Sequence, residues 1–293
     1  MIKKIGKWTL HKLLLSLPAK PYLYIFYYLH TKQRLTLKDP NYFTHKLQWL
    51  KLYGRLERFA LYGDKFSVRA YVSSKLGEKH MVPLIGVWDR VEDIPFDTLP
   101  SRFVLKLTTG SGYNFICKDK KTADLAAGKQ LLRKGLRENF YREEREPQYK
   151  QHIPRIIAEA YMEDETGQLR DFKIHCEKGE PRIIQVDTDR FTNHRSDQFD
   201  VDWNEIDYMV PAMFGGEEPA QNVTPIPRPK ELPQLLDAAR KLSEGFPYVR
   251  VDLYLVRGKV YFGEMTFTPG SGIVALEERA ELEMGKLVDL HAY

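Results

Sequence analysis

The chain has 293 residues, of which 43% are hydrophobic and 29% charged, so it is long enough for a folded soluble protein of one or two domains. Its two cysteines, Cys117 and Cys176, exclude a disulfide framework and are expected to be buried thiols. The net charge of +5 is uneven, because residues 1–58 carry nine Lys and three Arg against Asp39 and Glu57. That stretch therefore has a net charge of +10 and the rest −5. Together with the lack of a nucleic-acid-binding motif, this argues against a nucleic-acid partner.

The first predicted element is a basic, aromatic, helical N-terminal segment, residues 1–62. Near its start, lysines alternate with apolar side chains at helical spacing, which predicts an amphipathic helix with a cationic face. Such a helix suits an anionic membrane surface, so residues 1–38 are a candidate for membrane contact; the alternative is a helix packed on the main body. The longest apolar run, residues 22–29, is too short to span a bilayer, and residues 13–17 are too short for a signal peptide. We therefore expect a cytoplasmic protein, peripheral at the inner face of the membrane if the basic helix binds there.

Regular structure is predicted from Asp64 onward. One helix begins with Asp64 as its N-cap and ends near Gly77, and another covers residues 122–136. Residues 188–229 are rich in Pro, Gly, Asn and Asp and are predicted to be irregular, whereas residues 232–244 are predicted to be helical. Short apolar runs predict strands at residues 82–87, 102–108, 115–118, 155–161, 170–176 and 181–187.

The final pair of predicted strands carries the strongest chemical signal. A tight turn at Arg257-Gly258 predicts a hairpin in which Asp252 and Glu264 lie close together on one face. Two adjacent carboxylates repel each other unless a cation lies between them, and their hard oxygens suit Mg²⁺. Arg250, two residues before Asp252, points to the same side of its strand, which indicates phosphate chemistry. A structural ion-pair network is the alternative for this hairpin taken alone.

A second signal is a Gly-rich loop that joins two predicted strands. Gly110, Ser111 and Gly112 allow backbone N–H groups to approach phosphate oxygens, and Lys106 lies just before them. The loop is not a Walker A motif, because no Gly-Lys-Ser/Thr follows, and not a Rossmann motif, because a strand follows it. Taken alone, the loop favours a plain turn over a phosphate-binding loop.

These features follow one another in an order that is specific to a protein family. The motifs are Phe103-Val104-Leu105-Lys106, Ser111-Gly112, Asp171-Phe172-Lys173, Arg250-Val251-Asp252-Leu253-Tyr254 and Phe262-Gly263-Glu264-Met265-Thr266-Phe267-Thr268-Pro269-Gly270-Ser271-Gly272. They resemble the TupA-like ATP-grasp family of surface-polysaccharide biosynthesis proteins, from about Asn41 to Leu287. The resemblance implies an α+β, ATP-grasp fold of two subdomains with antiparallel sheets after the N-terminal segment. Residues 63–157 would carry the Gly-rich lid hairpin, and residues 158–293 the adenine hinge and the metal-binding hairpin.

The resemblance also implies roles for single residues in binding ATP. Lys65 and Lys106 would meet the phosphates, the Gly-rich loop would cover them, and residues 159–162 would form the hinge that reads adenine. Either Glu163 or Glu165 would bind the ribose hydroxyls, and the choice between them stays open. The implied cofactor-binding set is Lys65, Lys106, Gly110, Ser111, Gly112, Glu159, Ala160, Tyr161, Met162 and Asp171.

The metal and catalytic residues implied by the resemblance come mainly from the final hairpin. Asp252 and Glu264 resemble the two acidic Mg²⁺ ligands of ATP-grasp enzymes. Thr266 takes the place of a third ligand, where many members have Asn, and its hydroxyl is a poorer donor than an amide oxygen. Arg250 would face the transferred phosphoryl group, with Lys173 as a second catalytic residue.

The activity implied is an ATP- and Mg²⁺-dependent carboxylate–amine ligation through an acyl phosphate. It would join a small amine, such as an amino acid, to a uronic-acid-type carboxylate of a capsule, O-antigen or similar surface polysaccharide. Two other functions stay open: a glycosyltransferase, with an Asp-x-Asp metal site at residues 187–189 or 200–202, and a non-catalytic ATP-grasp scaffold. Candidates for binding an anionic acceptor, if they are not solvated loop residues, are Arg190, Asn193, His194 and Arg195.

Overall fold

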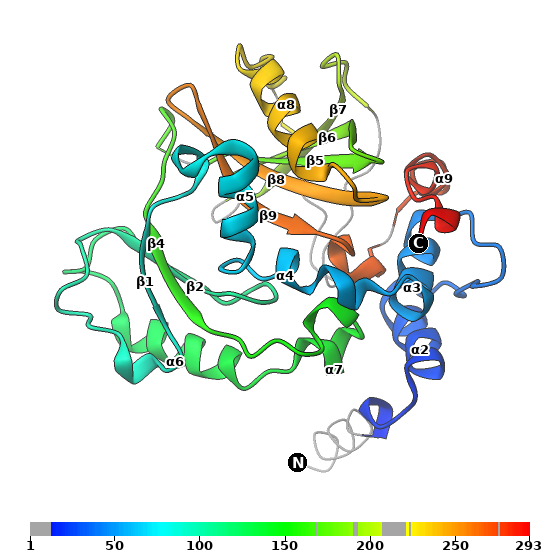
Figure 1. Ribbon diagram of the computed structural model, residues 1–293, viewed down its shortest axis with the longest axis horizontal. Helices are drawn as coiled ribbons and strands as arrows, with labels where there is room; N and C mark the ends of the chain where they lie inside the picture. Colours follow the sequence, from blue (N-terminus) through cyan, green and yellow to red (C-terminus); the bar gives the residue numbers. More distant parts are fainter. Residues whose placement is uncertain (1–12, 168, 190–192, 207–220, 223, 275) are drawn as a thin grey trace.

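The computed structural model shows an α+β fold with two antiparallel sheets, each forming its own lobe (Figure 1). The first sheet has the strand order β1-β4-β2-β3, and the second has the order β7-β6-β5-β8-β9. None of the described helices has the length and apolar character that crossing a membrane requires. The structure describes residues 13–167, 169–189, 193–206, 221–222, 224–274 and 276–293.

The first sheet contains four strands that the sequence predicts. They are β1 (Leu84–Trp88), β2 (Phe103–Leu107), β3 (Asn114–Cys117) and β4 (Ile156–Ala160), with α6 (Leu125–Leu136) packed against them. Alternation along β2 buries Phe103, Leu105 and Leu107, which share a core with Leu132 of α6. A subdomain boundary at 157/158 would cut β4, all of whose residues pair with β2, so the first sheet ends at Ala160.

The second sheet holds the predicted acidic hairpin. Its strands are β5 (Asp171–Glu177), β6 (Glu180–Thr188), β7 (Arg195–Asp200), β8 (Tyr248–Val256) and β9 (Lys259–Thr266), and the helices α5 (Val68–Leu76) and α8 (Leu232–Ser243) belong to the same core. The turn from β8 to β9 consists of Arg257 and Gly258, whose φ angles are 50° and 73°. Two consecutive positive φ angles are what a two-residue primed turn requires, so the predicted hairpin is confirmed.

The prediction of irregular structure for residues 188–229 is wrong where β7 pairs antiparallel with β6. Phe199 is the one apolar residue of β7, so a search for apolar alternation does not reveal the strand. Ser196, Asp197 and Gln198 are buried nevertheless, and the Ser196 hydroxyl donates a hydrogen bond of 2.7 Å to Asp187. Buried polar side chains, of which Gln198 lines a cavity, therefore replace the usual apolar pattern.

The N-terminal segment packs beside the second sheet rather than standing apart from it (Figure 1). Its helices are α2 (Ala19–Thr31), α3 (Phe43–Tyr53) and α4 (Ala60–Gly63), and α7 (Phe140–Glu144) and α9 (Glu278–Lys286) lie near them. Glu281 of α9 accepts a hydrogen bond of 2.9 Å from the backbone N–H of Thr44, and Lys46 donates to the carbonyl oxygen of Gly285 at 2.7 Å. The predicted basic amphipathic helix falls largely on residues 1–12, outside the described residues. Short 3₁₀ turns are η1 (Leu56–Phe59), η2 (Glu78–His80), η3 (Val91–Asp93), η4 (Pro147–Tyr149), η6 (Pro269–Gly272) and η7 (Leu290–Ala292).

Candidate active site

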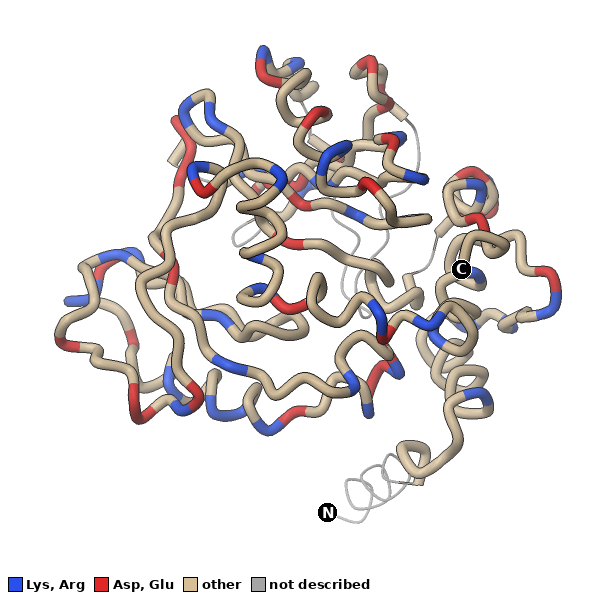
Figure 2. Tube along the Cα trace, in the orientation of Figure 1, with Lys and Arg blue, Asp and Glu red and all other residues tan. Residues whose placement is uncertain are grey.

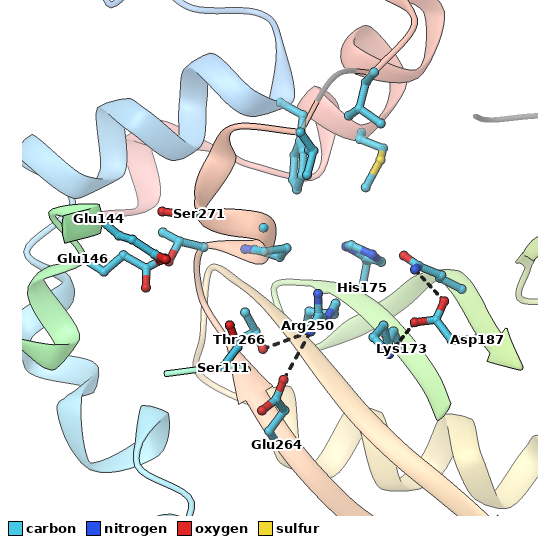
Figure 3. A pocket seen from close by; sticks show the side chains of 18 of the residues that line it. Ser111, Glu144, Glu146, Lys173, His175, Asp187, Arg250, Glu264, Thr266 and Ser271 are labelled. Carbon is cyan, nitrogen blue, oxygen red and sulfur yellow. Dashed lines mark hydrogen bonds and ion pairs between the residues drawn. The ribbon is translucent and has the colours of Figure 1, made fainter. Parts of the chain in front are cut away.

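The β8–β9 hairpin places side-chain oxygen atoms of three residues near one guanidinium nitrogen, Nη2 of Arg250. Asp252 lies directly opposite Glu264, and the register shifts at Gly263 immediately afterwards. Nη2 of Arg250 lies 2.7 Å from Oδ2 of Asp252. It also lies 3.3 Å from Oγ1 of Thr266 and 3.5 Å from Oε1 of Glu264 (Figure 3). The two acids and the arginine thus share one face of the hairpin, as predicted, and three oxygens surround a single cationic position.

This oxygen cluster fits a magnesium ion as well as a guanidinium. Burial alone would lower the pKa of Arg250, but the charge and the hydrogen bonds of Asp252 raise it, so the guanidinium remains charged. Carboxylate and hydroxyl oxygens are the donors that Mg²⁺ prefers, so Asp252, Glu264 and Thr266 would hold it. No group of three or more His, Cys, Asp or Glu side chains that could hold a metal occurs in the described part of the chain.

Lys65 connects this hairpin to the Gly-rich loop. Its Nζ donates a hydrogen bond of 2.7 Å to the carbonyl oxygen of Gly110 and lies 3.5 Å from Oε2 of Glu264. Gly110 and Gly112 have φ angles of 71° and 84°, a region that side chains other than glycine rarely adopt. A lysine thus lies between a predicted metal ligand and the loop predicted to cover the phosphates.

A cavity of about 320 Å³ lies between the first sheet and β8. Lys106 borders it, and its Nζ lies 2.6 Å from Oε2 of Glu159, which is also paired with Arg69 at 3.1 Å. Neither Glu163 nor Glu165 is among the residues that line it. Apolar side chains from both lobes suit the faces of a planar base. Six predicted cofactor-binding residues border this cavity: Lys106, Glu159, Ala160, Tyr161, Met162 and Asp171.

A second cavity, of about 250 Å³, borders on the β8–β9 hairpin and on the tip of the Gly-rich loop. We call it the substrate cavity, because an acceptor placed in it would lie beside Arg250. Its walls come from segments far apart in the sequence, which is why Glu144, Glu146 and His175 were not among the predicted site residues. Glu144, Glu146 and Ser271 lie on one side, His175, Lys173 and Asp187 lie on the other, and Arg250 and Glu264 lie between them (Figure 3).

Lys173 on β5 is enclosed by two aspartates. Its Nζ contacts Asp171 and lies 2.8 Å from Oδ2 of Asp187, which also accepts a hydrogen bond of 2.9 Å from Gln185. Burial alone would raise the pKa of Asp187, but the charge of Lys173 and the hydrogen bonds to the carboxylate hold it well below its usual value. The charge of Lys173 is therefore largely offset inside the wall, and its catalytic role stays a prediction.

Two uncharged polar groups on this wall have atoms without a protein partner. Nδ1 of His175 lies 2.8 Å from the hydroxyl of Tyr248, whereas its buried Nε2 has no hydrogen-bond partner within the described chain. Burial lowers the pKa of His175 to about 3, so the ring is neutral. Gln198 is 2% exposed and leaves Oε1 without a partner in the same way. Because unsatisfied buried polar atoms are costly, this wall is suited to a neutral polar ligand.

Comparison with known proteins decides the family. A family model described as TupA-like ATPgrasp matches residues 45–288, most of the chain. The chain belongs to the TupA-like ATP-grasp family. Membership confirms the predicted family and fold, and an ATP-grasp ligase is the class of enzyme that it supports. No curated protein matches the chain.

Solved structures similar to this ATP-grasp protein are distant relatives. It is similar to D-alanine–D-alanine ligase from Bacillus anthracis, with 16% identity over 78% of this chain and 65% of that one and a TM-score of 0.43. An L-amino acid ligase from Bacillus licheniformis shows 14% identity over 72% of this chain and 44% of that one, with a TM-score of 0.41. The same ligase in complex with ATP shows 17% identity over 82% of this chain and 70% of that one, with a TM-score of 0.43. The chain spans less than two thirds of the first two proteins, and likeness at this distance does not identify its substrates.

The irregular segment of this ATP-grasp protein contributes one of its predicted residues to the substrate cavity. His194 lines the cavity, whereas Arg195 donates a hydrogen bond of 2.6 Å to the carbonyl oxygen of Gln221. Arg190 lies outside the described residues. Of the Asp-x-Asp tripeptides, Asp187 pairs with Lys173, and Asp200 accepts hydrogen bonds that close its own turn. The glycosyltransferase alternative therefore gains no support from them.

The neutral state of His175 predicts a pH dependence of stability. Its pKa is about 3 in the folded protein and 6.5 for an unperturbed histidine, so the unfolded chain takes up the proton more readily between these values. Stability therefore falls as pH drops through this window, and His175→Gln should remove about 2 kcal/mol of the loss between pH 7 and pH 5. Urea unfolding of both proteins at the two pH values measures this difference. Equal losses in the two proteins would show that His175 is protonated in the fold.

Proposed function

We propose that this ATP-grasp protein is an ATP-dependent carboxylate–amine ligase that works through an acyl phosphate. The observation that carries the proposal is the oxygen cluster of Asp252, Glu264 and Thr266 around Arg250, with a cavity on the hinge side and the substrate cavity beside it. ATP would lie in the cavity of about 320 Å³, with its adenine at residues 159–162. Its phosphates would extend toward the lysines and the hairpin.

The chemistry follows from these positions. A carboxylate oxygen of the substrate attacks the γ-phosphorus of ATP, the bond to the bridging oxygen breaks, and ADP leaves. The uncharged amine nitrogen then attacks the acyl carbon, a C–N bond forms, inorganic phosphate leaves with the bonding electrons, and the nitrogen gives up one proton to water. Arg250 faces the charge that develops on the transferred phosphoryl group, and Lys65 and Lys106 offset the charge of the phosphates. Mg²⁺, when bound, reduces the repulsion between phosphate oxygens and the incoming carboxylate. No covalent enzyme nucleophile is required, because positioning and charge carry the catalysis.

We infer that the carboxylate belongs to a uronic-acid-type sugar of a bacterial surface polysaccharide and that the amine is small, such as an amino acid. The uncharged wall of His175 and Gln198 supports a hydroxylated substrate, because a hydroxyl both donates and accepts a hydrogen bond and so satisfies either imidazole tautomer. The test is phosphate release from Mg·ATP with panels of uronic acids and amino acids. Turnover that requires both substrates and yields an amide by mass spectrometry supports the proposal. ATP turnover that needs neither substrate would contradict it.

We propose that α2 of the N-terminal segment contacts an anionic membrane surface. One face of α2 is buried through Tyr22, Leu23 and Tyr27, while Ile25 is 38% and Leu29 48% exposed on the other. Residues 1–38 contain eight Lys and Arg and no Asp or Glu, and no acidic residue appears on α2 (Figure 2). Exposed apolar side chains within a wholly cationic segment suit the interface of a membrane with anionic lipids.

Charging this apolar face should weaken membrane association. The double variant Ile25→Asp/Leu29→Asp is expected to bind vesicles of phosphatidylcholine with 30% phosphatidylglycerol at least about tenfold more weakly, because each aliphatic side chain contributes roughly 1–3 kcal/mol when buried. Co-sedimentation measures the binding. Leu61→Asp is the matched control, because Leu61 is an apolar residue that is 65% exposed outside this face. Equal binding by the wild type and the double variant, or none by the wild type, would end the membrane proposal.

A further inference from the structure

The acidic side of the substrate cavity carries two carboxylates without a part in the reaction described above. Glu144 ends α7 and Glu146 precedes η4, and both line the cavity next to Ser271 (Figure 3). Glu146 is 6% exposed, and its Oε1 accepts a hydrogen bond from the hydroxyl of Thr268, two residues beyond β9. The hydroxyl of Ser271 interacts with both carboxylates. The hydrogen bonds given to this pair therefore come from neutral hydroxyl groups.

The pair has no close cationic partner. Within the described residues, no Lys, Arg or His nitrogen lies within 4.0 Å of either carboxylate. Lys51 of α3 donates instead to the carbonyl oxygens of Glu144 and Ser271, at 2.8 Å and 2.7 Å, and to the Ser271 hydroxyl at 2.6 Å. Arg145, between the two acids in the sequence, donates to the carbonyl oxygen of Leu15 at 2.7 Å. One buried carboxylate, that of Glu146, and one half-buried carboxylate, that of Glu144, against one ammonium leave this side of the cavity short of positive charge.

The protonation behaviour of the pair reflects this shortage. Burial raises the pKa of Glu146 to about 8, and the charge of Glu144 adds to the increase although Lys51 acts against it. Burial likewise raises the pKa of Glu144. A positive ligand placed between the two side chains would favour both as carboxylates.

An independent feature of the same cavity also points to a ligand. His175 is 2% exposed, and its Nε2, on the opposite side of the cavity, has no hydrogen-bond partner among the described residues. Arg250 and Glu264 lie between His175 and the acidic pair (Figure 3). Two substrates, one on each side, would thus meet at the residues that handle the phosphoryl group.

We propose that Glu144 and Glu146 form the subsite that binds the amine substrate as a primary ammonium. The assignment rests on the proposed ligase function and names the place of its second substrate. A primary ammonium brings one positive charge and three N–H donors, so it both bonds the two carboxylates and supplies the missing charge. The carboxylate substrate then occupies the neutral His175 side. An ammonium has no lone pair, so one carboxylate of the pair takes a proton from it before the nitrogen attacks. The nucleophile of this enzyme is therefore an amine rather than a neutral alcohol or a second acid.

Binding of a minimal amine tests the subsite. The probe is ethylammonium, titrated into the full chain with Mg·ATP and followed by nuclear magnetic resonance, with ethanol as an uncharged probe of similar size. Glu144→Gln and Glu146→Gln keep the shape of the side chains and remove their charge. Glu143→Gln is the matched control, because it changes the neighbouring acid of α7 outside the cavity lining. We expect saturable binding of ethylammonium but not of ethanol, weakened at least tenfold in each cavity variant and unchanged in the control.

The ATP affinity of each protein distinguishes a failure of the amine subsite from a failure of the proposed ligase function. We expect all variants to bind ATP like the wild type, which also shows that they fold. A wild type that binds ATP but not ethylammonium, or cavity variants that bind ethylammonium as well as the wild type does, would overturn the amine subsite and leave the ligase function standing. A wild type that binds no ATP would overturn both.

Discussion

Replacing Glu264 by alanine is expected to lower ATP turnover by about a hundredfold or more, because the change removes one of the oxygens that handle the metal and the transferred phosphoryl group. Glu264 lies opposite Asp252, 3.5 Å from Nζ of Lys65 and 3.5 Å from Nη2 of Arg250. Its side chain is 35% exposed, so the free energy of unfolding should change by no more than about 1 kcal/mol. Phosphate release and urea unfolding measure the two effects separately.

The control for this variant is an acid of the same sheet outside the site. Glu180 on β6 pairs with Arg240 at 3.0 Å, and its side chain is 53% exposed. Glu180→Ala should therefore keep the turnover of the wild type. Full turnover by Glu264→Ala would show that the β8–β9 hairpin is a structural ion-pair network rather than a metal site.

Replacing Lys106 by alanine should weaken ATP binding by about ten- to a hundredfold, the size expected for one charge-assisted contact with phosphate. Lys106 lines the cavity that holds the predicted hinge, and its side chain is 12% exposed. Without Lys106, Glu159 keeps Arg69 as an ion-pair partner, so its buried carboxylate does not lose all positive charge nearby. Calorimetric titration with Mg·ATP measures the affinity.

Lys121→Ala provides the comparison for Lys106→Ala. Lys121 is an exposed lysine in the turn after β3 and does not line the cavity. Its removal changes the net charge of the protein equally but should leave the affinity for ATP unchanged. Similar losses in both variants would mean that Lys106 acts through general electrostatic attraction rather than through contact with the nucleotide.

The β8–β9 hairpin could be predicted because it rests on local sequence signals, whereas the contacts of Lys65 and Lys106 with phosphate stay predictions from the family resemblance. Arg257-Gly258 between two β-type runs sets the register next to the turn, and the register shift at Gly263 then brings Asp252 opposite Glu264. Lys106 lies on a strand just before a loop in which Gly110 and Gly112 adopt positive φ angles, a conformation that favours glycine. Features of this kind depend on neighbours within a few residues, so one sequence suffices to find them.

The substrate cavity could not be predicted, because its walls meet only through packing. Glu144 and Glu146 lie in a polar stretch that is typical of a solvated surface, but Glu146 is buried and Glu144 half-buried, and Lys51 of α3 links the backbone of Glu144 to that of Ser271 in η6. His175 alternates with apolar residues along β5, as a core residue does. The strand β7 was missed because its buried side chains are polar, which reverses the pattern by which buried strands are found.

Calorimetric titration of the wild-type protein with ATP, with and without Mg²⁺, tests the nucleotide site most directly, with UDP-glucose as the rival ligand. We expect ATP to bind, the binding to strengthen when Mg²⁺ is present, and UDP-glucose to bind far more weakly. Clear binding of UDP-glucose without binding of ATP would contradict the ligase function and restore the glycosyltransferase alternative.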